Sequence, residues 1–376
     1  MDEKKIKSKI EKFFDCDNIN KFLSLVIETT NYRGYSRSIF VICEYRGVRF
    51  LTKIALYFKI APDLYDYKVS MHKGANYLQP VDMEIKTLQV LEEKIIRGGV
   101  SSCILEMIYH SCCENVIRLS KTLQKKKSRT KMSKLKSEIA VHNQHVANKT
   151  IAITNTLINY AKVVDLGLAH DKVSFIALEK YTLTLRTFLS KPVYLQMDAE
   201  IIRIITFQII YTIYQIQRVL PGFKHNDLHT DNIMIKIDPD FEYDPKHPVF
   251  ELYRTDLGDF LVPYLGFHAK IIDFAFAQIP SLKTYSYTTI DKEIMVMRMC
   301  NDIYFLMHDL RHTNEYGASI VKLIEPDMED SLIDVEYDTN MLASYRRYLK
   351  SDAFSSYRYN KDEDKVDIVK TFELRS

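Results

Sequence analysis

The segment from His225 to Asn232 constrains what this chain can be more than any other stretch; it reads His-Asn-Asp-Leu-His-Thr-Asp-Asn. It places a carboxylate, Asp227, five positions before a carboxamide, Asn232, and an apolar run, 233–235, follows directly. Asp227 suits the orientation of an attacking hydroxyl, and Asn232 suits the binding of Mg²⁺ against phosphates. The pattern therefore predicts a loop for phosphoryl transfer, a reaction catalysed mainly by positioning and charge neutralisation.

A second segment, 270–275, reads Lys-Ile-Ile-Asp-Phe-Ala, which predicts a buried strand ending in an acid, Asp273, that could bind the same metal. The two segments together resemble the H-R-D-x-x-x-x-N and D-F-G signatures of the protein kinase superfamily. The resemblance covers most of residues 34–310. It implies an α+β, two-lobed kinase-like fold, with a small antiparallel-sheet N-lobe carrying one helix and a larger, mainly helical C-lobe. It also implies ATP and Mg²⁺ as cofactors.

The N-lobe candidates follow from a hairpin predicted by two apolar runs around Arg46-Gly47. Lys53 emerges from its second strand, and the resemblance implies that it binds the ATP phosphates, with Lys59 as the alternative. Its expected partner is Glu84, on a helix predicted at 80–91. Without the kinase signatures, Lys53 could equally be a solvent-facing strand lysine and Glu84 a solvated helix residue.

The expected nucleotide pocket departs from the kinase pattern at its lid. The lid should lie near residues 34–38, yet Gly34 is its only glycine. The lid must therefore be looser or must cover the phosphates with side chains such as Ser36 and Arg37. The hinge between lobes is expected after a strand at 173–181. The backbone of Glu179 to Tyr181 would hydrogen-bond the adenine edge, with Leu178 behind the base.

The C-lobe should contain a buried helix through 201–216 and a second helix beginning at Asp302, whose carboxylate would accept backbone donors from the 225–232 loop. Three departures stand out in the two signatures. Asn226 replaces an arginine, His229 replaces the lysine that would touch the transferred phosphate, and Ala275 replaces a glycine. If the backbone at Ala275 has positive φ, alanine there costs about 1 kcal/mol or more. We therefore expect Asp273 to hold a single orientation, facing the metal.

The predicted organisation has three parts: a helical extension at 1–30, an N-lobe at 31–180 with a basic insertion near 115–150, and a C-lobe at 181–376 with an insertion near 238–262. The basic run at 121–136 is interpreted first as a solvated surface. The alternative is that it docks an anionic partner, either nucleic acid, a membrane surface or an acidic protein.

Composition excludes several classes for the chain as a whole. A net charge of +3 over 376 residues is too small to indicate nucleic-acid binding by the whole molecule. The six cysteines show no paired spacing, which predicts reduced thiols, no disulfides and a cytosolic location. Charged and polar residues interrupt the longest apolar run, 201–216, so no membrane span is expected.

Long insertions and the Val262-Pro263-Tyr264-Leu265-Gly266 turn resemble divergent serine/threonine kinases of large cytoplasmic DNA viruses. This implies transfer to Ser/Thr hydroxyls of a protein substrate, in the host cytoplasm or associated with the virion. Two alternatives stay open: a pseudokinase scaffold, and a small-molecule phosphotransferase of the aminoglycoside or choline kinase type. The sequence identifies neither the substrate nor the oligomeric state.

Overall fold

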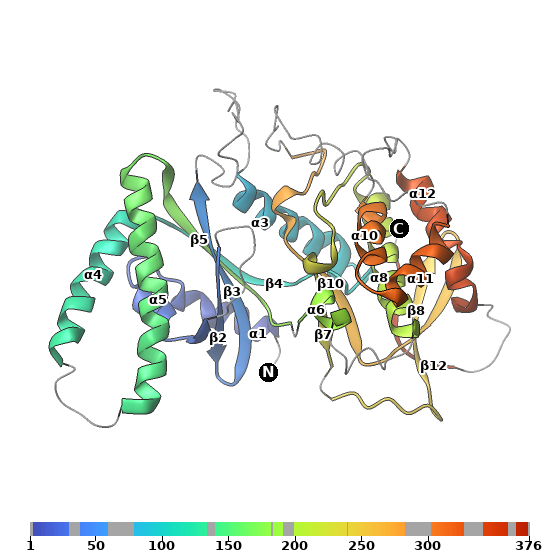
Figure 1. Cartoon of the computed structure of the whole chain (residues 1–376), viewed down its shortest axis with the longest axis horizontal. Helices are drawn as coiled ribbons and strands as arrows, with labels where there is room; N and C mark the ends of the chain where they lie inside the picture. Colours follow the sequence, from blue (N-terminus) through green and yellow to red (C-terminus); the bar gives the residue numbers. More distant parts are fainter. Residues whose placement is uncertain are drawn as a thin grey trace. The chain divides into compact units, whose positions relative to one another are not determined.

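The computed structural model describes residues 3–29, 38–58, 79–133, 140–181, 183–190, 199–238, 240–282, 302–326, 341–359 and 366–374 (Figure 1). The chain divides into two compact units. The first consists of residues 1–72 and 106–180, and the second of residues 73–105 and 181–376. The later boundary falls between Lys180 and Tyr181, inside the segment expected to be the hinge.

The first unit is built on a five-stranded antiparallel sheet with the order β1-β2-β3-β5-β4. Its strands are β1 Val26–Thr29, β2 Ile39–Tyr45, β3 Val48–Phe58, β4 Met107–Glu114 and β5 Ala169–Glu179. The predicted hairpin is confirmed as β2 and β3. Both turn residues, Arg46 and Gly47, have positive φ, the geometry that matches the twist of paired strands.

Helices cover this sheet: α1 Glu3–Ile10, a 3₁₀ turn Glu11–Phe13, α2 Ile19–Leu23, α4 Val116–Ser133 and α5 Ala140–Asp165. The N-terminal segment is helical as expected, but its last residues add strand β1 to the sheet instead. Phe14 and Phe22 pack their rings against Phe175 of β5, so the segment belongs to the core. Most of the basic run lies in α4, which packs beside α5.

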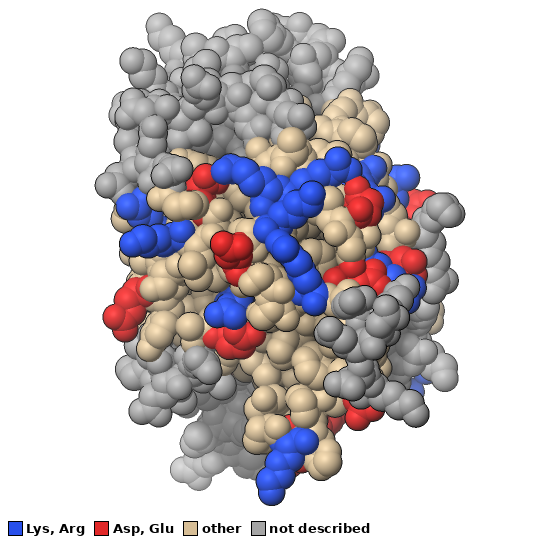
Figure 2. Space-filling model, turned by 90° about the vertical axis from the view of Figure 1, so that its right-hand side faces the viewer, with Lys and Arg blue, Asp and Glu red and all other residues tan. Residues whose placement is uncertain are grey.

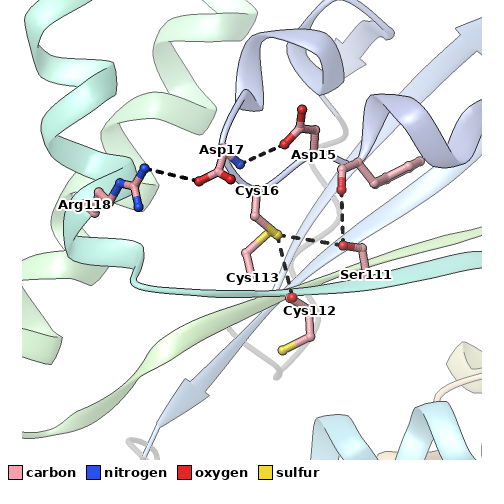
Figure 3. The surroundings of a disulfide bond; sticks show 8 residues. Asp15, Cys16, Asp17, Ser111, Cys112, Cys113 and Arg118 are labelled. Carbon is pink, nitrogen blue, oxygen red and sulfur yellow. Dashed lines mark hydrogen bonds and ion pairs between the residues drawn. A yellow bond between two sulfur atoms is a disulfide. The ribbon is translucent and has the colours of Figure 1, made fainter.

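A disulfide between Cys16 and Cys113 corrects the prediction of no disulfides (Figure 3). Cys16 lies just before α2 and Cys113 lies in β4, 97 residues later, with Cα atoms 5.2 Å apart. Packing of the N-terminal helices on the sheet creates this proximity, which sequence spacing alone does not reveal. Cys112, the neighbour of Cys113, is exposed and free.

The double variant Cys16→Ser/Cys113→Ser should lower the free energy of unfolding by roughly 2–5 kcal/mol, because the bond closes a long loop in the unfolded chain. Thermal melting without reductant measures the effect, and Cys112→Ser is the matched control. Wild-type protein in dithiothreitol should melt like the double variant. Equal melting of the oxidised and reduced wild type would show that the bond does not stabilise the fold.

The second unit packs around a long helix, α8 Ala199–Val219, whose side chains are buried on nearly every face. Phe207 and Tyr211 of α8 contact the ring of Tyr253, and Phe207 also contacts Phe354 and Tyr357. The other helices are α3 Pro80–Leu91, a π-helical turn Glu92–Ile96, α6 Leu185–Ser190, α10 Asp302–Arg311, α11 Glu315–Ile324, α12 Met341–Leu349 and a 3₁₀ helix Asp352–Tyr357. The bounds predicted for α3 are confirmed, and it belongs to this unit because it packs against residues 274–276.

Two small sheets complete the second unit. One has the order β10-β7-β6, with β6 Leu183–Thr184, β7 Ile233–Ile237 and β10 Phe267–Ile271. The other has the order β11-β9-β8-β12, with β8 Val249–Thr255, β9 Gly258–Pro263, β11 Arg358–Tyr359 and β12 Asp367–Phe372. The expected insertion at 238–262 thus forms a hairpin that pairs with the last strands of the chain.

Among the described residues, α8 alone is long and apolar enough to cross a membrane by length and composition. However, 83% of its most apolar window is buried inside the protein. We therefore assign α8 to the core of the second unit.

On the face drawn in Figure 2, Lys and Arg side chains lie close to Asp and Glu side chains. In the second unit, Arg346 and Arg218 both reach Asp256, and Arg347 pairs with Glu325. These arginines are therefore part of ion pairs and do not form a bare basic patch.

Glu251 of β8 is a buried acid outside the loops at 225–232 and 270–275, with 1% of its surface exposed. Burial raises the pKa of Glu251 from 4.5 to about 7, although the Tyr253 hydroxyl donates a hydrogen bond to it at 2.6 Å. Because the pKa is higher in the folded state than in the unfolded state, this group favours folding at low pH. That contribution is lost as the pH rises from about 4.5 through 7.

Glu251→Gln should therefore raise the free energy of unfolding at pH 8 and change it much less at pH 5, where the glutamate is protonated in the folded state. At 1.36 kcal/mol per pH unit, the pKa difference corresponds to about 3 kcal/mol. Urea unfolding at the two pH values measures the effect. An equal gain in the free energy of unfolding at both pH values would mean that ionisation of Glu251 does not cause the gain.

Candidate active site

The loop at residues 225–232 is fixed from two sides within the second unit. The Asp302 carboxylate accepts the backbone N–H of His225 at 2.7 Å and that of Asn226 at 2.9 Å, which confirms the role predicted for Asp302. The His225 ring is fully buried, and its Nε2 donates to the Ile272 carbonyl at 2.8 Å. This bond joins the loop to the residue immediately before Asp273.

The structure brings Asp227, His229 and Asn232 together at the end of this loop. The Asn232 amide nitrogen donates to the Asp227 backbone carbonyl at 2.8 Å and to its Oδ2 at 2.9 Å. A 3₁₀ turn over Thr230–Asn232 places the amide there. Since both hydrogen bonds use Nδ2, the amide oxygen is the atom that could bind a hard cation.

The ring of His229 lies against the same two residues. Its Nδ1 accepts the Asp231 backbone N–H at 3.3 Å, and its Nε2 is 3.6 Å from Asp227 Oδ1. The Asn232 amide nitrogen also lies 3.1 Å from His229 Nε2. Burial lowers the pKa of His229, which favours the neutral ring.

Asp273 follows β10, which pairs with β7 beyond Asn232, and Ile272 N–H donates to the Asn232 carbonyl at 3.0 Å. Asp273 itself has the left-handed backbone, with φ of 59°. Ala275 is not among the described residues of positive φ, so the expected strain at Ala275 is wrong. Phe274 is fully buried, with its ring 4.9 Å from that of His225.

The negative charge of Asp273 affects the ionisation of Asp227. Burial, and then the negative charge of Asp273, raise the pKa of Asp227 to about 7, and the hydrogen bond from Asn232 opposes them only in part. A cation bound near Asp273 would remove part of this repulsion. Among the described residues, no group of three His, Cys, Asp or Glu side chains could hold a metal ion. Asp273 and Asn232 would, together with phosphate oxygens, supply the kind of oxygen ligands that usually bind Mg²⁺.

The remaining predicted residues come from other elements of the chain. Lys53 lies in β3, buried, with its Nζ 5.7 Å from the Phe40 ring centroid. Glu84 lies buried in α3. Lys53 and Glu84 belong to different units, so their pairing stays a prediction. Gly34, Ser36 and Lys59 lie outside the described residues.

The expected base-binding segment ends β5. Leu178 is buried between its cross-strand partners on β3 and β4. The Glu179 N–H already donates to the Glu106 carbonyl at 3.0 Å. Of the Glu179 backbone groups, only the carbonyl could therefore hydrogen-bond an adenine. The other predicted hydrogen bonds to the adenine would have to come from the backbone of Lys180 and Tyr181.

Two residues from other elements, Asp309 and Arg186, hold the 225–232 loop in place, and the sequence analysis did not identify either of them. Asp309 accepts both the backbone N–H and the hydroxyl of Thr230, at 2.8 and 2.6 Å, and Arg186 bonds to Asp309 and Asp231. One signal was available: Asp309 follows Asp302 by seven positions, two turns along the same helix face. Nothing in the sequence pointed to Arg186.

Parts of the chain are similar in sequence to known proteins. No family model matches the chain. It is 26% identical over 198 residues to a protein of Acanthamoeba polyphaga mimivirus, provisionally named serine/threonine-protein kinase R400. The match covers 44% of this chain and 40% of that protein. A second mimivirus protein, provisionally named serine/threonine-protein kinase R301, is 34% identical over 141 residues, which cover 36% of this chain and 33% of that protein. The matches thus span less than half of either relative.

Two solved structures also show similarity. The kinase domain of PF14_0431 has 12% identity and a TM-score of 0.38, over 80% of this chain and 69% of that one. WaaP in complex with acyl carrier protein has 11% identity and a TM-score of 0.38, over 91% and 95%. Both TM-scores are low, so neither structure contributes to the assignment.

Over part of its length the chain is thus similar to two proteins named as serine/threonine kinases, as its two signatures predict. The α+β division into a smaller antiparallel-sheet unit and a larger, mainly helical unit is also as expected. The prediction of a single helix in the sheet unit is wrong, because that unit carries α1, α2, α4 and α5 and the predicted helix at 80–91 belongs to the larger unit. The two relatives described above are both viral, which confirms the resemblance to the kinases of large DNA viruses.

Proposed function

We propose that this chain is an ATP- and Mg²⁺-dependent protein kinase that transfers a phosphoryl group to Ser or Thr hydroxyls. The observation that carries the proposal is the arrangement of Asp227, Asn232 and Asp273. Hydrogen bonds join the first two directly, and the β7–β10 pairing brings the third beside them. The names of the viral relatives support the same class of reaction and acceptor.

Each residue has a separate task in this proposal. Asp227 orients the acceptor hydroxyl and takes its proton as the phosphoryl group is transferred. Asn232 and Asp273 would hold Mg²⁺, which supplies neutralisation of the phosphate charges. The donor set fits, because both offer oxygen ligands and because the repulsion between Asp227 and Asp273 favours a cation. The ring of His229 lies beside Asp227 and Asn232 and could contact a phosphate oxygen in place of the usual lysine.

Location and partners belong to the same proposal. We propose a location in the host cytoplasm or in the virion, and a protein substrate. The basic run at 121–136 is a solvated surface or, alternatively, docks an anionic partner. The Cys16–Cys113 bond argues for a stage in an oxidising environment.

The test is an assay of the purified chain with labelled ATP and Mg²⁺, with dephosphorylated casein, kanamycin or choline as acceptor. We expect label on Ser and Thr of casein only. Label on kanamycin or choline alone would contradict the proposal and favour the small-molecule phosphotransferase. An absence of transfer to every acceptor would favour the pseudokinase.

A further inference from the structure

An ion-pair network within the second unit connects three elements around the 225–232 loop. Arg186, in α6, donates to Asp231 Oδ2 at 2.7 Å and to the two Asp309 oxygens at 2.9 and 3.2 Å. Asp309, in α10, also accepts the backbone N–H and the hydroxyl of Thr230. A single carboxylate thus ties the loop to α10, and a single guanidinium ties it to α6.

The network is better placed to hold the loop than an ordinary surface ion pair. The Asp309 side chain is 21% exposed. Its burial opposes ionisation, but the hydrogen bonds from Thr230 and the charge of Arg186 outweigh it, so the pKa of Asp309 is lowered. Hydrogen bonds to an ionised acceptor are about twice as strong as neutral ones. The bonds from Thr230 are of this kind.

The tethered turn leads directly to the candidate reacting groups. The backbone N–H of Asp231 bonds to the His229 ring, and the next residue, Asn232, holds Asp227 through its amide. A shift of the turn over 230–232 would therefore move the carboxamide and the ring against Asp227. Misplacement by about 1 Å can cost roughly a hundredfold in rate.

We propose that Arg186 and Asp309 are positioning residues that fix the turn at 230–232 and thereby align Asn232 with Asp227. This inference rests on the proposed phosphoryl transfer. The two residues do not act on the phosphates or the acceptor themselves. Their loss should therefore reduce kcat and leave the KM for ATP nearly unchanged.

The kinetic test uses Arg186→Gln, Asp309→Asn and the double variant, with casein as acceptor. Each single variant should lower kcat by roughly 10- to 100-fold. The double variant should have a kcat only slightly lower than that of either single variant, because each single substitution already breaks the same network. Arg186→Lys keeps the charge and should recover part of the rate. The matched control is Arg347→Gln, which breaks the bidentate pair between Arg347 of α12 and Glu325 at the end of α11, and it should behave as wild type.

Hydrogen exchange of the peptide over 225–232 tests the inference independently of activity. Exchange should speed up in Arg186→Gln and Asp309→Asn and stay unchanged in Arg347→Gln. Unchanged exchange, fully additive losses of kcat, or a loss expressed only in the KM for ATP would each overturn the inference. If the wild type transfers no phosphate, the proposed function fails, and exchange alone then decides whether the network holds the loop.

Discussion

Asp227→Asn should lower the rate of phosphoryl transfer by roughly 10² to 10⁴ while leaving the fold intact. The substitution keeps the size of the side chain, and its carbonyl oxygen can still accept the hydrogen bond from Asn232. What it removes is the carboxylate that we propose as the acceptor of the hydroxyl proton. Single-turnover transfer to casein, compared with wild type at equal ATP saturation, measures the loss.

The matched control is Asp240→Asn, an exposed aspartate between β7 and β8. It should transfer at the wild-type rate. Hydrogen exchange over 225–232 should be the same for Asp227→Asn, the control and wild type. Asp227→Asn should melt no lower than wild type, because it replaces a buried carboxylate whose pKa is raised by burial and by the charge of Asp273. Undiminished transfer by Asp227→Asn would remove the basis of the kinase proposal, because no other described residue has been assigned the role of base.

Asp273→Asn and Asp273→Ala should each reduce transfer at least about 10²-fold, since a carboxylate that holds the metal supplies several kcal/mol of charge stabilisation. Their stabilities should differ. Asparagine tolerates the left-handed backbone found at this position, whereas alanine there costs roughly 1–2 kcal/mol. Asp273→Ala should therefore also unfold at lower urea concentration.

Titration with Mn²⁺ in the presence of ATP checks the metal role directly, with Asp273→Asn binding more weakly than wild type. Wild-type affinity for Mn²⁺ together with normal transfer would show that Asp273 is not a ligand. Equal stability of the alanine and asparagine variants would show that the left-handed backbone at this position carries no penalty.

The parts of the site that the sequence predicts are those encoded by local spacing. Asp227 and Asn232 lie on one short loop, and apolar runs mark the strands on either side, so their proximity follows from neighbouring residues. The β2–β3 hairpin and α3 were predictable for the same reason, since turn residues and helical periodicity are local signals.

The features that escaped prediction depend on contacts between distant segments. Arg186 bonds with residues 45 and 123 positions away, and Cys16 bonds with a residue 97 positions away. Such partners are selected by how helices and sheets pack, which no local pattern records. The left-handed backbone was expected at Ala275 because of the family signature, yet this chain has it at Asp273.

Strand β12 has a consequence for how the protein is made. It pairs in parallel with β8, joining residues 249–253 to residues 367–372, and the Phe372 ring packs against that of Tyr253. A ribosome synthesises the chain from its N-terminus, so β8 emerges long before its partner. Until residue 372 has left the ribosome, β8 presents an open edge of unpaired backbone groups, the kind of edge that pairs with other chains. Completion of this sheet must therefore be a late event, and the nascent chain is most exposed to aggregation just before it.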